Sequence, residues 1–274
     1  MNPKRSYLYG AHVIVTGASD GIGKEIVRLL VGRFNCTVLG IARGEEKLAA
    51  LKTELGGNFR YIVGDVTDVG LWKNISADFD SEPCSVLINN AGIMPPFTLA
   101  LGEPDEELRR VFEVNYFAPV TATRMLLPKM KRVCAMPAVV NVCSSSALCP
   151  LAATSAYSSS KSALKAFTEA LASKKKARPS FAACLRGLLK RRFSKIGRIF
   201  RREKVAKISM TAEKTAQKIV YGMAKRKRRV IIGADAMAMN AFYKLAPKSA
   251  ANVIDSVMKK AHVPSYDAAF EDKE

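Results

Sequence analysis

The sequence predicts a doubly wound α/β fold, in which a parallel sheet of about seven strands carries helices on both faces. Three observations lead to this prediction. Short β-branched runs alternate with helical patterns from residue 12 onward, which is typical of parallel strands joined by helical crossovers. The 274 residues are 49% apolar, enough for a core of that size. No repeat or low-complexity linker divides the chain, so a single domain over residues 1–274 is expected.

The expected elements follow one another in a regular order. The strands are short apolar runs at HVIVT (12–16), TVLGI (37–41), FRYIVGD (59–65), SVLINN (85–90), AVVNVCS (138–144), FAAC (181–184) and RVIIG (229–233). The helices cover about 22–33, 45–55, 105–130, 155–173 and 211–226, and a helical extension is expected over 235–274. In such a sheet, ligands bind at the carboxyl ends of the strands.

A glycine-rich turn, TGASDGIG (16–23), follows the first strand and opens the first helix. Its glycines at 17, 21 and 23 allow a tight turn that brings backbone N–H groups and a helix N-terminus against a pyrophosphate. Many strand-to-helix turns need a glycine for purely structural reasons. The position of this one, after the first strand, favours a dinucleotide site.

The second strand ends in Ala42 and Arg43. An acidic residue here would accept hydrogen bonds from the adenosine ribose and repel a 2′-phosphate. Arg43 would attract that phosphate instead, which favours NADP(H) over NAD(H); the alternative is a solvated arginine at a helix start. Asp20, within the glycine turn, argues weakly in the opposite direction.

At this point the chain resembles the short-chain dehydrogenase/reductase family over about residues 10–185. A series of motifs carries the resemblance in order: TGASDGIG (16–23), GDV (64–66), NNAG (89–92), Asn115 in VFEVNYFAP, NVCS (141–144) and YSSSK (157–161). The resemblance implies a Rossmann-like sheet and an oxidoreductase that interconverts a ketone and a secondary alcohol with NADP(H).

Matching positions carry the family's functional residues over to this chain. The catalytic group would be Asn115, Ser144, Tyr157 and Lys161. The cofactor-binding residues would be Gly17, Ser19, Gly21, Ile22, Gly23, Arg43, Asp65, Val66, Asn89, Ala91, Gly92, Tyr157, Lys161 and Gly187, with Asn90 beside them. Asn115 would resemble the family's relay residue, which anchors a water between the lysine and solvent.

The pair Tyr157 and Lys161 has a chemical rationale. Side chains four apart on a helix project from the same face, and a neighbouring ammonium favours the phenolate form of a tyrosine, which can then exchange a proton with a carbonyl oxygen. Tyr221 and Lys225 have the same spacing, but without a serine at a strand end thirteen residues upstream, so Tyr221 is expected to be a packing residue. Ser145 and Ser146 are the alternatives to Ser144 should the strand end later.

The chain departs from the family pattern after the catalytic helix. Arg186-Gly187 stands where the family has Pro-Gly, and Lys190 stands at the family's threonine position. Gly187 still permits a turn, whereas Arg186 has no fixed φ and adds a charge. The departure bears on how the nicotinamide would be seated.

The net charge of +20 is concentrated in two segments. Residues 174–207 carry +13 and the run 225–229 carries +5, which leaves +2 for the rest of the chain. Residues 188–207 fall where the family has a substrate lid, and Leu189, Phe193, Ile196 and Phe200 share one helical face. That face would meet a lipophilic substrate or dock permanently on the core; a membrane-surface helix and a nucleic-acid arm are lesser alternatives.

The clusters Lys174–Arg178 and Lys225–Arg229 both precede strands. They are therefore expected at the amino ends of neighbouring strands, opposite the active site, as one docking patch for an anionic partner or a membrane surface. No specific nucleic acid is expected to bind. The family resemblance implies a homodimer or homotetramer, with helices 105–130 and 155–173 at the interface.

Other features narrow the class of protein. Six cysteines form no CxxC pair and only two histidines are present, so no metal site is expected and the thiols should be reduced, as in a cytoplasmic protein. No apolar run precedes His12, and no window approaches 18 apolar residues, so neither a secretory signal nor a spanning helix is expected. A cytoplasmic location is predicted, with peripheral membrane contact as the alternative.

The leading hypothesis is thus an NADP(H)-dependent reductase or dehydrogenase acting on a fatty-acyl, steroid or other lipid-like carbonyl. The competing hypothesis is a catalytically weak dinucleotide-binding homologue that acts as an interaction or membrane-surface protein through its basic patches. Arg186 and Lys190 are the residues that favour the second hypothesis.

Overall fold

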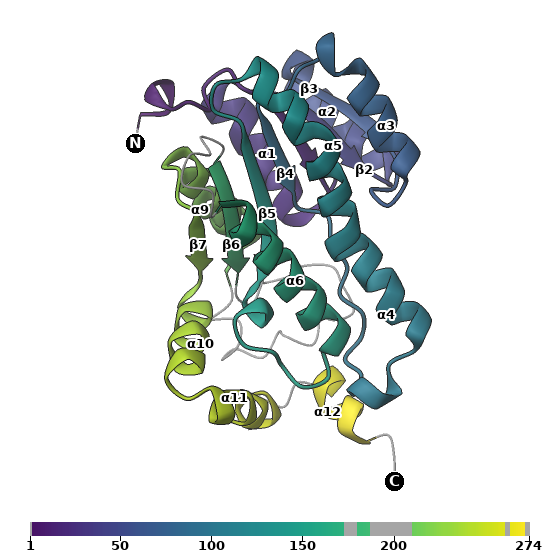
Figure 1. Ribbon diagram of the computed structural model, residues 1–274, viewed down its shortest axis with the longest axis vertical. Coiled ribbons are helices and arrows are strands. Elements are labelled where there is room, and N and C mark those ends of the chain that lie inside the picture. The colour runs from purple at the N-terminus through teal and green to yellow at the C-terminus, as the bar shows by residue number, and fades with distance from the viewer. Residues whose placement is uncertain (1, 173–179, 187–209, 261–263, 272–274) are drawn as a thin grey trace.

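The computed structural model describes residues 2–172, 180–186, 210–260 and 264–271. Its centre is a seven-stranded, fully parallel sheet with the strand order β3-β2-β1-β4-β5-β6-β7 (Figure 1). The strands are β1 (His12–Thr16), β2 (Thr37–Ala42), β3 (Phe59–Val63), β4 (Val86–Asn89), β5 (Ala138–Ser144), β6 (Ser180–Arg186) and β7 (Arg229–Ile232). The order reverses between β1 and β4, which opens a crevice at their carboxyl ends.

Helices join the strands and cover both faces of the sheet. They are α1 (Gly21–Phe34), α2 (Glu45–Leu55), α3 (Val69–Ala77), α4 (Asp105–Phe112), α5 (Ala118–Val133), α6 (Ser155–Ala172), α9 (Ala212–Ala224), α10 (Ala234–Leu245), α11 (Pro247–Lys260) and α12 (Pro264–Glu271). The predicted fold class is therefore confirmed, including the strand count. The last three helices lie beyond the carboxyl ends of β6 and β7 (Figure 1).

Two apolar layers hold the helices against the sheet. On one face α1, α2 and α9 pack around fully buried residues such as Ile26, Leu48 and Ile219. On the other face α3 and α5 pack around Trp72 and Leu126. Burial of a side chain of this kind contributes about 1.5–3 kcal/mol each, so the alternating β-branched and helical patterns of the sequence translate directly into a two-sided core.

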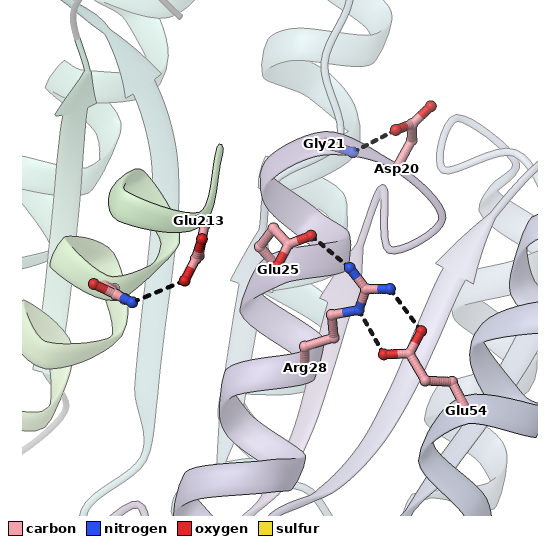
Figure 2. Close-up of polar contacts among 7 residues, drawn as sticks. Asp20, Gly21, Glu25, Arg28, Glu54 and Glu213 are labelled. Atoms are coloured by element: carbon pink, nitrogen blue, oxygen red, sulfur yellow. Dashed lines mark hydrogen bonds and ion pairs between the residues drawn. The ribbon is translucent and has the colours of Figure 1, made fainter. Parts of the chain in front are cut away.

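Side-chain contacts fix the start of α1 and its position against α2. Asp20 caps α1 by accepting a hydrogen bond from Gly21 N at 2.7 Å. The guanidinium of Arg28 bonds both oxygens of Glu54 on α2 at 2.6 Å and Glu25 on its own helix at 2.8 Å (Figure 2). Bidentate geometry of this kind fixes the mutual position of two helices, here the two that flank β2.

The structure differs from the expected elements in two details. The predicted helix over 105–130 is instead α4, a π-helical turn over Glu113–Phe117 and α5, because one extra residue is accommodated around Asn115. The predicted strand 59–65 ends at Val63, although Gly64 N still donates a hydrogen bond to Ala42 O at the end of β2. Predictions for Lys174–Arg178, Gly187, Lys190 and the segment 188–207 lie outside the described residues.

Within the described part of the chain, no helix combines the length and apolar character needed to span a membrane. Those same residues also contain no cluster of His, Cys, Asp and Glu that could hold a metal ion. Cys36, Cys84, Cys134, Cys143 and Cys149 are free thiols.

Candidate active site

The predicted catalytic pair lies on α6, packed against the carboxyl end of β5. Tyr157 and Lys161 are one helical turn apart and only 7% and 4% exposed. Lys161 Nζ donates a hydrogen bond to the carbonyl oxygen of Val142 at 3.2 Å. Burial of an ammonium is costly unless it is hydrogen-bonded, so this contact holds the cation in a fixed place at the end of the strand.

Ser144 is the last residue of β5 and is half-buried. Its Oγ accepts a hydrogen bond from Ser146 N at 3.3 Å, which caps the short helical turn over Ser145–Ala147. The two alternatives, Ser145 and Ser146, lie within that turn and are buried. Because the strand ends at Ser144, the geometry favours it over its two neighbours as the serine that faces the crevice.

Asn115 lies fully buried within the π-helical turn between α4 and α5. Its Oδ1 accepts a hydrogen bond from Ile93 N and its Nδ2 donates one to Ile93 O, both at 2.9 Å. Nδ2 also donates to Ser160 Oγ on α6 at 3.2 Å. The amide thereby joins the loop after β4 to α6, and it lies within the π turn, where one extra residue is accommodated.

Gly92 marks the point where these groups meet. A Cβ atom added there would lie 2.9 Å from Lys161 Nζ and 3.0 Å from Asn115 Oδ1. Only a glycine fits so close to both polar groups. The residues predicted from three separate motifs (NNAG, Asn115 and YSSSK) are therefore brought together at one place.

A chain of buried hydrogen bonds lies beneath the site. Asn89 Nδ2 donates to Asn141 Oδ1 on the neighbouring strand at 2.8 Å, and Asn141 Nδ2 donates to Thr168 Oγ1 on α6 at 2.7 Å. Asn89 also lies 3.4 Å from Thr123 Oγ1 on α5. This network ties β4, β5, α5 and α6 together below Tyr157 and Lys161, and it leaves Asn89 only 2% exposed.

The glycine turn packs closely against the NNAG segment. Gly17 has a φ of 66°, in the left-handed region, and a Cβ on Gly23 would come within 2.0 Å of Gly17 O. Thr16 Oγ1 accepts hydrogen bonds from Asn90 N and Ala91 N, each at 3.0 Å. The turn and the end of β4 thus form one rigid unit at the crevice between β1 and β4.

The same turn has features that fit a dinucleotide. The first N–H groups of α1 have no partner within the helix, and a Cβ on Gly21 would meet no described atom within 4 Å, so this helix N-terminus borders open space. Anions bind favourably at such a place. Ser19 and Ile22 belong to the turn and the first helical residues, as predicted.

Two charged side chains, Arg43 after β2 and Asp65 after β3, lie where an adenosine would bind. Arg43 has a 72% exposed side chain, with Nη1 4.0 Å from Asp65 Oδ2. Hydrogen bonds from the backbone and hydroxyl of Thr67, with a contribution from the Arg43 charge, hold the pKa of Asp65 below its usual range although partial burial opposes this. Val66 is 8% exposed and its carbonyl accepts a hydrogen bond from Trp72 Nε1 at 2.8 Å.

Asp20 is neutralised by a residue that sequence reasoning did not single out. Lys47, on α2, pairs with Asp20 Oδ2 at 2.6 Å. That hydrogen bond is the largest cause of the lowered pKa of Asp20, which also accepts from Gly21 N. Asp20 and Lys47 are 27 positions apart, and only the fold shows that the helix after β2 reaches the glycine turn.

Glu103 is a second residue that the sequence did not reveal. Its Oε2 accepts hydrogen bonds from the hydroxyl of Ser155 and from Ala156 N, the latter at 3.1 Å. Both donors lie at the N-terminus of α6, one and two residues before Tyr157. A carboxylate at a helix N-terminus is stabilising, so Glu103 caps α6 from a loop more than fifty residues upstream.

Residues on the opposite edge of the sheet are structural or solvent-exposed. Tyr221 packs against Phe34 with ring centroids 5.9 Å apart, so it is the packing residue that was predicted. β6 and β7 are neighbours, and Lys225–Arg229 lie at the amino end of β7. Within this run Arg226 stacks on Tyr7 at 4.4 Å and Arg229 bonds Asn240 at 3.1 Å. Lys225, Lys227 and Arg228 are exposed.

Comparison with known proteins finds oxidoreductases with similar sequences. A family model for short chain dehydrogenases matches residues 11–178. An uncharacterized oxidoreductase of Saccharomyces cerevisiae, YIR035C, is 32% identical over 170 residues, which cover 61% of this chain and 66% of the relative. A very-long-chain 3-oxoacyl-CoA reductase of Eremothecium gossypii is 34% identical over 175 residues, covering 60% of this chain and 49% of the relative.

The chain therefore spans about half to two thirds of the length of these two relatives. Among solved structures, a short-chain dehydrogenase from Streptomyces avermitilis has a similar fold, with a TM-score of 0.76 and 25% identity. That match covers 92% of this chain and 98% of the bacterial one.

Proposed function

The chain belongs to the short-chain dehydrogenase family, and from this premise we propose that it is an NADP(H)-dependent oxidoreductase interconverting a ketone and a secondary alcohol. The observation that carries the proposal is that Lys161 and Asn115 meet at Gly92, with Lys161 bonded to β5 two residues before Ser144 and one helical turn from Tyr157. The proposal assigns each of these four residues a separate task in the reaction.

Tyr157 exchanges the proton with the substrate oxygen, and Ser144 donates a hydrogen bond that fixes where this oxygen lies. Lys161, held by the Val142 carbonyl, keeps a positive charge beside the tyrosine and can bond the hydroxyls of a nicotinamide ribose. Bound NADP(H) supplies or accepts the hydride. Asn115 fixes the Ile93 loop and α6 relative to each other, so that the tyrosine and the crevice keep their spacing.

The coenzyme preference rests on the charges at the tip of β2. Arg43 is exposed, and its closest approach to Asp65, between Nη1 and Oδ2, is 4.0 Å, too long for a hydrogen bond. Its guanidinium can therefore bond a 2′-phosphate in bidentate fashion. Asp20 is a weak argument for NAD(H), because its carboxylate would repel a phosphate. Lys47 pairs with this carboxylate at 2.6 Å and neutralises its charge. Both observations favour NADP(H).

The proposed substrate is a lipophilic carbonyl compound. Ile93 and Met94 follow the NNAG segment, are half-buried and lie beside the catalytic amide. The similarity to a very-long-chain 3-oxoacyl-CoA reductase supports the same substrate class. Apolar contact of this kind contributes about 0.8 kcal/mol per buried methylene, so a long apolar chain would add substantially to binding.

The test is a titration with NADPH by fluorescence, followed by a screen of lipophilic ketones by loss of NADPH absorbance. Tyr157→Phe is expected to lower kcat about 10²- to 10⁴-fold while NADPH binding persists. Tyr221→Phe is the matched control, because this tyrosine has the same spacing to a lysine but packs on Phe34. Turnover that survives Tyr157→Phe would refute the proposed mechanism.

A second candidate function has two observations in its favour. Arg186 pairs in register with Ser144, so the residue that replaces the family proline is adjacent to the catalytic serine in the sheet. Lys225, Lys227 and Arg228 form an exposed basic cluster on the far edge. A chain that binds NADPH, turns over no ketone and sediments with anionic phosphatidylserine vesicles, but not after K225Q/K227Q/R228Q, would be a binding protein instead of an enzyme.

A further inference from the structure

The end of the molecule opposite the active site is formed by the segments that precede the strands. These are the N-terminal turn before β1, the end of α1 before β2, the end of α5 before β5 and residues 225–228 before β7. Figure 1 shows the N-terminus at this end and the helices α10, α11 and α12 at the other. Because the crevice lies at the carboxyl ends of the strands, this surface is separate from the candidate active site.

Six exposed cations gather at this end, on the face of the sheet that α1 and α9 cover. None of them forms an ion pair with any other residue that the structure describes. Cations elsewhere on the surface are often paired, as Arg28 is with Glu54 and Lys47 is with Asp20. The six, which we call the basic face, are Lys4, Arg5, Arg33, Lys225, Lys227 and Arg228.

The acidic residues at this end lie on the other side of the sheet. Asp78, Asp80 and Glu82 precede β4, and Phe79 among them packs in the layer of α3 and α5. Asp80 pairs with Arg132 at 3.5 Å, and Glu82 pairs with Arg60. The charge of the basic face is therefore not cancelled by these acids.

Tyr7 fixes the N-terminal turn to the end of α9. Its hydroxyl donates a hydrogen bond to Met223 O at 3.1 Å, and the guanidinium of Arg226 stacks on its ring at 4.4 Å. Arg226 has a φ of 54°, a left-handed conformation that is uncommon outside glycine. The turn is closed by bonds from Arg226 N to Met223 O at 2.7 Å and from Lys227 N to Gly222 O at 3.0 Å. The two basic segments are thus held side by side.

Three exposed apolar or aromatic side chains border the basic face. Tyr9, in the N-terminal turn, is 40% exposed, and Val133 and Met136, at the end of α5, are 52% and 39% exposed. Cys134 links the two places: burial raises the pKa of Tyr7 to about 12, the Arg226 charge opposes this, and the nearby Cys134 thiol adds to it. Exposed cations beside exposed apolar groups are typical of surfaces that bind a lipid interface.

We propose that this end of the molecule docks on membranes that contain anionic phospholipids. The six cations contact the lipid headgroups, and Tyr9, Val133 and Met136 enter the boundary between headgroups and acyl chains. A nucleic acid would attract the same cations but would gain nothing from Val133 and Met136. Docking in this orientation leaves the crevice facing water, so that coenzyme and substrate enter from the side away from the bilayer. The proposal goes beyond the reductase function and is independent of it.

The first test is sedimentation of the full-length protein with vesicles of phosphatidylserine and phosphatidylcholine. K225Q/K227Q/R228Q should weaken binding about 100-fold, because each cation near an anionic surface contributes about fivefold. K214Q/K244Q/K248Q is the matched control, since it removes the same charge from exposed sites outside the basic face, and it should sediment nearly as the wild type does. Vesicles of phosphatidylcholine alone should bind none of the proteins.

The second test separates a lipid interface from other polyanions. V133S/M136S should weaken vesicle binding about tenfold, because it removes apolar groups that enter the bilayer, and leave binding to heparin unchanged. L101S/L245S changes two exposed apolar residues outside this end and should leave both unchanged. The substituted side chains are exposed, so urea unfolding should give the same midpoint for every variant. NADPH affinity and turnover should also match the wild type.

The outcomes decide between the occupants of the surface. Equal sedimentation of the wild type and K225Q/K227Q/R228Q would overturn the proposal. So would heparin binding without vesicle binding, which would assign the basic face to a nucleic acid or an acidic protein. Vesicle binding that survives V133S/M136S unchanged would refute insertion into the lipid boundary. A wild type that binds vesicles as expected but turns over no ketone would support the docking surface and refute only the reductase function.

Discussion

The two ends of the active-site crevice are built in different ways. At the dinucleotide end, the contacts join residues that belong to recognisable sequence motifs: the glycine turn packs on NNAG, and Asp65 bonds Thr67 two residues away. At the other end, the contacts involve residues that belong to no motif, such as Glu103 at the start of α6 and Phe97 against Tyr266. The residues of the first end can therefore be identified in the sequence, whereas those of the second are identified only in the folded chain.

This difference suggests that the two ends respond separately to mutation. Changes at the dinucleotide end should alter coenzyme binding, together with the backbone packing where the change lies in the glycine turn. Changes at the substrate end should alter the orientation of catalytic groups or the choice of substrate while coenzyme binding persists. The four predictions below test that separation, beginning with the largest expected effect.

Gly23→Ala should have the largest effect, because the new Cβ would come within 2.0 Å of Gly17 O, a backbone atom that cannot move without breaking the turn. Overpacking of this kind costs about 1–3 kcal/mol of unfolding free energy or more, and NADPH binding should fall below detection. Gly32→Ala on the same helix is the control, since a Cβ there meets no described atom within 4 Å. Its expected effect is a gain of about 0.5–1 kcal/mol. Urea unfolding measures the stability of the two variants, and NADPH fluorescence measures their coenzyme binding. Equal effects of the two substitutions would contradict the prediction.

Glu103→Ala should lower the stability and the activity through the catalytic helix. Loss of the cap on α6 should cost about 1–2 kcal/mol and reduce kcat more than it weakens NADPH binding. Glu103→Gln retains an acceptor for Ser155 and Ala156 and should restore most of kcat. Glu106→Ala, an exposed acid in the first turn of α4, serves as the control. A purely structural role would be indicated by NADPH affinity and kcat falling in parallel, with no rescue by glutamine.

Arg43→Gln should weaken NADPH binding about tenfold, because it removes the charge-assisted hydrogen bond that we propose to the 2′-phosphate, and leave NADH binding unchanged. The side chain is exposed, so the stability of the fold should not change. Arg33→Gln, which removes the same charge from the exposed last turn of α1, is the control. Fluorescence titration with both coenzymes gives the ratio. Equal losses for NADPH and NADH would mean that Arg43 does not distinguish the coenzymes.

The smallest effect is expected from lowering the pH, which should weaken the contact between Asp255 and α12. Burial raises the pKa of Asp255, but the hydrogen bond from Tyr266 and the pairing with Lys259 outweigh this and hold it below its usual range. A carboxyl group with a lowered folded-state pKa contributes stability above its unfolded pKa of about 3.9, and that contribution is lost as the pH falls through the folded value. Amide exchange of α12 should therefore become faster as the pH drops below about 4, after correction for intrinsic rates.

Asp255→Asn is the matched control for this pH dependence. It retains an acceptor for the Tyr266 hydroxyl but cannot titrate, so the corrected exchange of α12 should no longer depend on pH in that range. Amides of α1 are the internal reference, because this helix packs in a different layer. A variant that keeps the wild-type pH profile would show that another group controls the stability of α12.

Sequence reasoning predicted the sheet and most of the candidate site for a physical reason. Strand runs, the glycine turn and the Tyr157–Lys161 spacing depend on backbone periodicity and on steric limits close in the chain, and these are visible in the sequence. It missed Lys47, Glu103 and the contact of Tyr266 with Phe97, because a surface lysine, a loop glutamate and a helical tyrosine have no local signal. Their contacts depend on where α2, α4 and the C-terminal helices are placed by tertiary packing.

The π turn at Asn115 shows the same limit on a smaller scale. The apolar pattern over 105–130 is continuous enough to predict one helix, and that is nearly what the chain forms. The inserted residue is stabilised by the hydrogen bonds of Asn115 to Ile93 and Ser160, more than twenty and forty positions away. A helical defect that depends on distant partners cannot be recognised from helical periodicity alone.

The asparagine pair beneath the site also has a consequence for folding fidelity. The sequences of β4 and β5, VLIN and AVVNVCS, are so similar in their small apolar residues that the strands could pair equally well one position out of step. Asn89 and Asn141 are aligned in the native register and bond each other. A slip of one residue would turn one amide to the opposite face and break the hydrogen bond between them, and a buried amide group that loses its partner costs about 1–3 kcal/mol. The hydrogen bond between the two amides thus specifies the register of the central strands before any ligand is present.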